Sequence, residues 1–138
     1  MGTRSLTAFI NKARESQEIC VMYRQYDGYP EGHGLQLAEF LSSGKMVNGI
    51  SVGETELVFN GMGCLAAQVI SYFKEGPGGF YIEPAGTRDV GEEYIYKVYT
   101  NDNGQLMMRC FDVWKGRTIF VGTPEKFIAK YGKVKETA

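Results

Sequence analysis

The sequence predicts an α+β fold, with a single domain in which an antiparallel β-sheet packs against two or three helices. Three observations support this prediction. The chain has 138 residues, which is a common size for one domain. Several segments alternate apolar and polar residues, as half-buried strands do, and Gly, Asn and Pro turn signals separate them. Other segments carry apolar residues three and four positions apart, which is typical of amphipathic helices.

Two strands are expected near the start of the sequence. Residues 3–10 place Leu6, Ala8 and Ile10 on one face, and residues 18–26 are rich in β-branched and aromatic side chains. The polar connection between them is too short for a parallel crossover. We therefore expect these strands to form an antiparallel hairpin.

Two helices are expected in the middle of the chain. Residues 35–41 have a short amphipathic pattern, and Gly44 is suited to end it. Residues 44–63 are rich in Gly and Asn and are expected to form a loop with one short strand, long enough to suggest a functional role. Residues 64–74 show the strongest helical pattern, which the glycine-rich turn at 76–79 ends.

The remaining sequence is predicted to be mainly β. The expected strands are residues 79–83, 93–100, 105–113 and 117–121. The sequence N-D-N-G at 101–104 predicts a hairpin turn. Thr123 and Pro124 are suited to the N-cap and first position of a last helix. The domain is expected to span residues 1–132, and the tail at 133–138 is expected to be disordered.

Composition and charge exclude several classes of function. The net charge of −1 provides no basic surface for nucleic acid. No apolar run is long enough to span a bilayer, and no signal peptide is recognisable. Cys20, Cys64 and Cys110 form no C-x-x-C pair, which argues against a zinc site and favours free thiols in a reducing cytoplasm. No phosphate-loop or dinucleotide motif is present, so no cofactor is expected.

The densest group of polar and aromatic side chains lies at residues 23–34, Y-R-Q-Y-D-G-Y-P-E-G-H-G. Tyrosines supply flat aromatic surface, arginine supplies paired donors for a carboxylate or phosphate, and glycine allows a ligand to approach the backbone closely. We expect this stretch to form one wall of a pocket, with the turn at 60–64 or the loop at 88–93 as the other. The residues predicted to bind a ligand are Tyr23, Arg24, Tyr26, Asp27, Tyr29, Glu31, His33, Asn60 and Arg88.

A purely structural explanation of the same stretch stays open. Asp27 can cap its own turn, Pro30 can make the turn rigid, and Tyr26 and Tyr29 can pack against the first helix. A metal site would need the single histidine together with Asp27 and Glu31. That set lacks a recognisable ligand spacing, so no metal site is predicted.

Cys64 suggests a catalytic alternative. It follows G-M-G and is expected at the N-terminus of the main helix, where the helix dipole and free amides lower a thiol pKa and can hold an oxyanion. His33 would be the general base, oriented by Asp27 or Glu31. A packed, structural Cys64 is the competing interpretation, because cysteine is among the most buried residue types.

Four segments resemble a recurring family of small proteins of phages and bacterial genomes. They are M-G-T-R-S-L-T, Y-R-Q-Y-D-G-Y-P-E-G-H-G, N-G-M-G-C-L-A-A-Q and G-E-E-Y-I-Y. Members of that family begin with M-G-T-R and carry a D-G-Y-P-x-G element. The resemblance implies a phage- or prophage-associated cytoplasmic setting, and it transfers no catalytic residues.

The sequence therefore predicts a cytoplasmic, non-catalytic binding protein that recognises a small anionic ligand or a host protein. The alternative is a cysteine-dependent hydrolase or transferase that uses Cys64 and His33. Neither interpretation involves a nucleic acid, a membrane or a cofactor, and the oligomeric state is not predicted.

Overall fold

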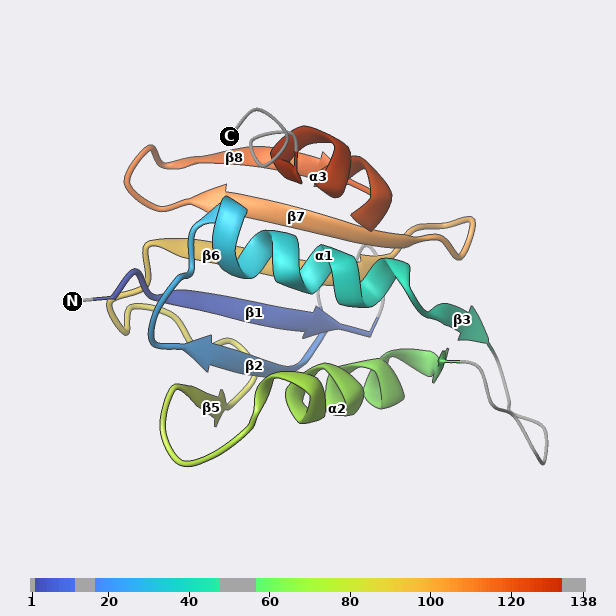
Figure 1. Cartoon of the computed structure of the whole chain (residues 1–138), viewed down its shortest axis with the longest axis horizontal. Helices are drawn as coiled ribbons and strands as arrows, with labels where there is room; N and C mark the ends of the chain where they lie inside the picture. Colours follow the sequence, from blue (N-terminus) through green and yellow to red (C-terminus); the bar gives the residue numbers. More distant parts are fainter. Residues whose placement is uncertain (1, 12–16, 48–56, 133–138) are drawn as a thin grey trace.

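A six-stranded sheet forms the centre of the computed structural model, which describes residues 2–11, 17–47 and 57–132 (Figure 1). The strand order is β5-β2-β1-β6-β7-β8. The strands are β1 (Ser5–Ile10), β2 (Glu18–Arg24), β5 (Phe80–Glu83), β6 (Tyr94–Thr100), β7 (Leu106–Asp112) and β8 (Arg117–Gly122). Each lies within a few residues of a predicted strand, and the expected α+β class is confirmed.

The sheet differs from the prediction in one pair of strands. β1 and β6 run parallel, whereas every other pair in this sheet is antiparallel. The reason is the connection between β5 and β6, residues 84–93, which crosses behind β2 and β1 instead of forming a hairpin (Figure 1). A crossover of this kind can return the chain to the sheet in the direction of β1.

Three helices cover one face of the sheet (Figure 1). They are α1 (Leu35–Ser42), α2 (Gly61–Phe73) and α3 (Pro124–Tyr131). Their apolar faces meet buried side chains of the strands, among them Phe9, Met22, Tyr96, Val98 and Met108. The predicted cap of the last helix is confirmed, because Thr123 Oγ1 accepts a hydrogen bond from the Lys126 amide at 3.3 Å.

A π-helical turn, η1 (Pro30–Gly34), precedes α1 and was not predicted. The Leu35 amide donates a hydrogen bond to the Pro30 carbonyl five residues earlier, so helical structure begins one turn before the expected start at residue 35. Proline at the first helical position loses no hydrogen bond, which explains why the helix can begin there.

The segment predicted as a loop at 44–63 is partly regular. β3 (Lys45–Val47) and β4 (Val58–Asn60) form a separate parallel pair, and α2 begins at Gly61 rather than at residue 64. The middle of this segment, 48–56, lies outside the described residues, as does the tail predicted to be disordered at 133–138.

The crossover at 84–93 covers the sheet face opposite to the helices. It is fastened to β2, because Glu18 accepts hydrogen bonds from Arg88 at 2.6 Å and from the Gly86 amide at 2.7 Å. Leu6 and Ala8 are fully buried on this side. Both faces of β1 are therefore enclosed. None of the described helices is long and apolar enough to cross a bilayer.

Candidate functional site

The stretch singled out in the sequence is held beside β1 and β6 by hydrogen bonds of the Gly28 backbone. The Gly28 amide donates to the Thr3 carbonyl at 2.8 Å, and the Tyr96 hydroxyl donates to the Gly28 carbonyl at 2.7 Å. Asp27 has a φ of +56°, and its carbonyl accepts from the His33 amide at 2.7 Å. This turn and η1 bring His33 back toward β2.

His33 is fully buried, and both of its ring nitrogens have partners. Nε2 lies 2.8 Å from Thr7 Oγ1, and Nδ1 lies 3.1 Å from Arg24 Nη1. Because arginine can only donate, Nδ1 must be the acceptor, and the ring proton lies on Nε2 and points to Thr7. Burial, assisted by the charge of Arg24, lowers the pKa of His33 to about 3. The histidine is therefore neutral at physiological pH.

Arg24 carries a nearly buried charge, with 4% of its surface exposed. Nη1 donates both to His33 and to Gln36 Oε1, the latter at 2.7 Å, while Nε has no hydrogen-bond partner. Among the described residues, no carboxylate forms an ion pair with this arginine. Three aromatic rings lie around the guanidinium carbon, with ring centroids 4.9 Å away for Phe80, 5.0 Å for Tyr26 and 5.6 Å for Phe73.

Arg24 lines a cavity of about 500 Å³, which we call the Arg24 cavity. The cavity lies between the end of α2, the polar face of α1 and the edge of the sheet at Phe80. Its lining residues are Arg24, Tyr26, Gln36, Glu39, Tyr72, Phe73, Glu75 and Phe80. A smaller hollow of about 250 Å³ shares four of these residues and extends along the glycine-rich turn at 76–79.

The buried charge of Arg24 favours an anion in its part of the cavity, and the carboxylates of Glu39 and Glu75 line another part of it. Burial lowers the pKa of Arg24 from its ordinary value, but a guanidinium remains charged in proteins. Burying such a charge costs several kcal/mol unless partners compensate it. The aromatic rings and the neutral acceptors compensate part of this cost, on the order of 1 kcal/mol for each exposed cation–π contact. A carboxylate or phosphate in the cavity would supply the missing opposite charge.

Several residues predicted to bind a ligand lie elsewhere. Tyr23 packs against Tyr81, with ring centroids 6.1 Å apart, beside the core under the crossover. Arg88 is paired with Glu18. Asn60 is the last residue of β4. Neither the turn at 60–64 nor the loop at 88–93 contributes a residue to the Arg24 cavity, so the predicted opposite wall is replaced by α1 and the end of α2.

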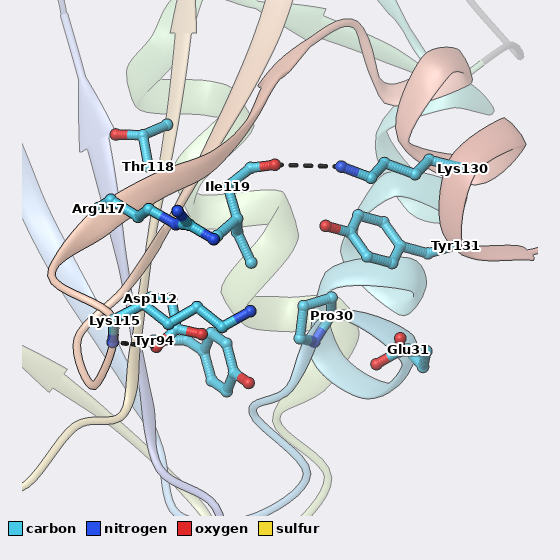
Figure 2. Close-up of a pocket in the computed structure, with 10 residues that line it drawn as sticks. All are labelled: Pro30, Glu31, Tyr94, Asp112, Lys115, Arg117, Thr118, Ile119, Lys130 and Tyr131. Atoms are coloured by element: carbon cyan, nitrogen blue, oxygen red, sulfur yellow. Dashed lines mark hydrogen bonds between the residues drawn. The ribbon is translucent and has the colours of Figure 1, made fainter.

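The rest of the stretch turns away from the Arg24 cavity. Tyr29 is 39% exposed, and its hydroxyl makes only a long contact of 3.5 Å with Asp27 Oδ1. Glu31 lines a different cavity, together with residues of the β7–β8 hairpin and α3 (Figure 2). Of the nine residues predicted to bind a ligand, Arg24 and Tyr26 line the Arg24 cavity, and His33 supports Arg24 from behind.

Cys64 and His33 are not brought together. Cys64 is the fourth residue of α2, and its Sγ accepts a hydrogen bond from Gln68 Nε2 at 3.4 Å. The His33 ring packs against Phe73, the last residue of the same helix, roughly 13 Å further along the axis at the usual rise per residue. Because Thr7 and Arg24 occupy both ring nitrogens, His33 is not placed to act as a base for Cys64.

The sequence did not reveal the residues that complete the Arg24 cavity. In the sequence, Gln36 and Glu39 lie on the polar side of the helix predicted at 35–41, while Phe73 and Phe80 lie in the predicted helix and strand on either side of the glycine-rich turn. The one available signal was their aromatic character next to that turn. No group of three or more potential ligand residues that could hold a metal ion occurs in the described parts of the chain.

Comparison of the chain with family models, curated proteins and solved structures gives no match. The expected membership in a family of small phage and bacterial proteins stays a prediction. Any functional conclusion therefore depends on the geometry of the described residues.

Proposed function

We propose that this protein is a non-catalytic binding protein that takes up a small anionic molecule in the Arg24 cavity. The observation that carries the proposal is the state of Arg24, whose guanidinium is almost completely buried, has an unpartnered Nε and forms no ion pair with a described carboxylate. The two hydrogen bonds that this side chain makes with described residues both use Nη1. A guanidinium can hold a carboxylate or phosphate through two parallel N–H groups.

The lining of the cavity narrows the class of ligand. Tyr26 and Tyr72 are 42% and 54% exposed, and the Tyr72 ring is held by stacking on Phe40 with centroids 4.4 Å apart. These tyrosines offer flat surfaces for an aromatic or planar group. Glu39 and Glu75 add acceptors for hydroxyl or amino groups. The ligand class is a small planar acid with hydrogen-bond donors at its other end.

The neutral state of His33 supports binding rather than catalysis. A general base must reach the proton that it removes, and His33 is enclosed between Thr7 and Arg24. Its role in the proposal is to orient the guanidinium. The cellular setting that we propose is the cytoplasm of a bacterium that carries a phage or prophage, on the basis of the M-G-T-R and D-G-Y-P-x-G motifs.

Replacing Tyr26 tests the Arg24 cavity without removing a buried residue. The measurement is isothermal titration with small planar acids, beginning with benzoate and phenyl phosphate. We expect Tyr26→Ala to weaken binding by about tenfold, because the lost stacking on ligand and guanidinium is worth on the order of 1 kcal/mol. Tyr29→Ala is the matched control, since Tyr29 is similarly exposed but does not line the cavity.

The Nε–H resonance of Arg24 gives a second measurement, because Nε belongs to the guanidinium that the acid is proposed to contact. Its NMR signal should shift when the acid binds, in the wild type and in Tyr29→Ala alike. The proposal would be refuted if no planar acid moved this signal at millimolar concentration. It would also be refuted if Tyr26→Ala and Tyr29→Ala bound the acid equally well.

A further inference from the structure

A second cavity, drawn in Figure 2, shares no residue with the Arg24 cavity. Its volume is about 560 Å³. It is built by η1, the first residue of β6, the β7–β8 hairpin and the end of α3. Because the hairpin contributes most of its charged groups, we call it the hairpin cavity.

Three cations line the hairpin cavity. Lys115 lies in the β7–β8 turn, Arg117 begins β8, and Lys130 is near the end of α3. Lys130 Nζ is held by the Ile119 carbonyl at 3.2 Å. Lys115 and Arg117 are exposed and form no ion pair with a carboxylate of the described chain. Figure 2 shows the Lys115 ammonium group reaching into the cavity.

Two carboxylates in the lining have different roles. Asp112 is nearly buried, and its Oδ1 accepts the backbone amide of Lys115 at 3.0 Å, which fixes the turn. Asp112 and Arg117 are register partners across β7 and β8, yet no ion pair joins them. Glu31 is exposed on η1, opposite the hairpin (Figure 2). The cavity therefore presents an excess of positive charge on one side and a carboxylate acceptor on the other.

Two tyrosine hydroxyls complete the polar lining. Tyr94 begins β6, and Tyr131 ends α3, where its ring packs on Phe127 with centroids 4.5 Å apart. Burial raises the pKa of Tyr131 to about 12, so its hydroxyl keeps its proton. Both side chains can donate or accept a hydrogen bond and can pack a ring face against a ligand.

We propose that the hairpin cavity binds a phosphorylated sugar. Lys115 and Arg117 would hold the phosphate, and Glu31 would accept hydrogen bonds from sugar hydroxyl groups. Tyr94 and Tyr131 would contact the sugar ring and its hydroxyls. The volume lies within the range of small-molecule sites and is far larger than a phosphate ion requires.

The only tryptophan of the chain provides a readout. Trp114 is 83% exposed and precedes Lys115 in the hairpin, so a ligand at Lys115 should change its fluorescence. Ribose 5-phosphate is the probe. Inorganic phosphate and ribose, which correspond to its two parts, are tested separately as controls. We expect ribose 5-phosphate to bind at least about tenfold more tightly than phosphate, with ribose alone giving no change at the same concentration.

Variants that remove a charge test the contacts to the phosphate and the contact to the sugar separately. Lys115→Gln and Arg117→Gln should each weaken ribose 5-phosphate by about tenfold. Glu31→Gln should weaken ribose 5-phosphate and leave inorganic phosphate unchanged. Lys126→Gln, on an exposed position of α3 outside the cavity, should bind as the wild type does. All four positions are exposed, so the variants should fold.

Two results would overturn this proposal. One is the absence of any fluorescence or calorimetric response to ribose 5-phosphate at millimolar concentration. The other is equal affinity for ribose 5-phosphate and inorganic phosphate, which would mean that the cavity recognises no sugar. Tyr26→Ala, which alters only the Arg24 cavity, should bind ribose 5-phosphate as the wild type does. A failure of this proposal can therefore be told apart from a failure of the proposed function.

Discussion

Arg24 and His33 form a buried pair whose chemistry depends on which ring nitrogen holds the proton. With Nδ1 accepting from Arg24, a second proton on the ring would face a guanidinium at 3.1 Å. The low pKa of His33 follows mainly from burial and in addition from this contact. The same pair explains why His33 orients Arg24 instead of lining the Arg24 cavity itself.

Acid should destabilise the fold through His33 before it affects most carboxylates. The unfolded-state pKa is near 6.5 and the folded-state pKa is about 3, so between these values the unfolded chain binds more protons. Stability is therefore fully present above about pH 6.5 and falls as the pH decreases. Between pH 7.5 and 5, the free energy of unfolding should drop by about 2 kcal/mol. Urea denaturation at both pH values measures this difference.

A His33→Gln variant serves as the control for this pH effect. The amide cannot take up a proton in this range, so the difference between pH 7.5 and 5 should largely disappear even though the variant is less stable overall. A variant that kept the full wild-type pH dependence would show that another group is responsible.

At the level of elements, η1 and α1 approach α3 closely at a glycine. A Cβ at position 34 would lie 2.5 Å from Phe127 Cζ and 2.9 Å from a Tyr96 ring carbon. Gly34→Ala should therefore destabilise the fold by about 1–3 kcal/mol through overpacking. Gly63→Ala is the matched control, because a Cβ there meets nothing within 4 Å and alanine favours the helix. In chemical denaturation, the free energy of unfolding should fall for Gly34→Ala and rise for Gly63→Ala.

The carboxylate of Glu18 joins the crossover at 84–93 to β2. Burial alone would raise the pKa of Glu18, but hydrogen bonds from Arg88 and the Gly86 amide lower it. This stabilisation is present above about pH 4.5 and is lost as the pH falls further. Glu18→Gln should cost about 1–2 kcal/mol and speed hydrogen exchange of amides in the crossover. Glu83→Gln, on neighbouring β5, should change neither quantity, and an unchanged exchange rate in Glu18→Gln would contradict the prediction.

For the whole molecule, local sequence patterns predicted most of the helices and strands but few of the contacts between them. Alternation placed β6 and β7 and the turn between them, because hairpin partners are neighbours in sequence. The same alternation placed Leu6, Ala8 and Ile10 on one face of β1, yet Ser5 and Thr7 on the opposite face are also fully buried. Helices cover one side of β1 and the crossover covers the other, and no local pattern encodes that arrangement.

The candidate sites show the same contrast between local sequence patterns and contacts that form only in the fold. Residues 23–34 were identified by density alone, and Arg24 with Tyr26 proved to line a cavity. The hairpin cavity was missed because its charged side chains, Lys115 and Lys130 among them, come from three separate segments of the sequence. These groups meet only after η1, β8 and α3 have packed together.

The parallel pairing of β1 with β6 has a kinetic consequence. Leu6 pairs with Ile95, so most of the chain must be present before the middle of the sheet can close. Contacts between such distant positions slow folding, because the entropy cost of closing a long loop arises before the strand pairing contributes any stabilisation. Until β6 arrives, β1 has an open edge next to apolar side chains such as Phe9. Strands in that state pair readily with other chains, so refolding yield should fall as protein concentration rises.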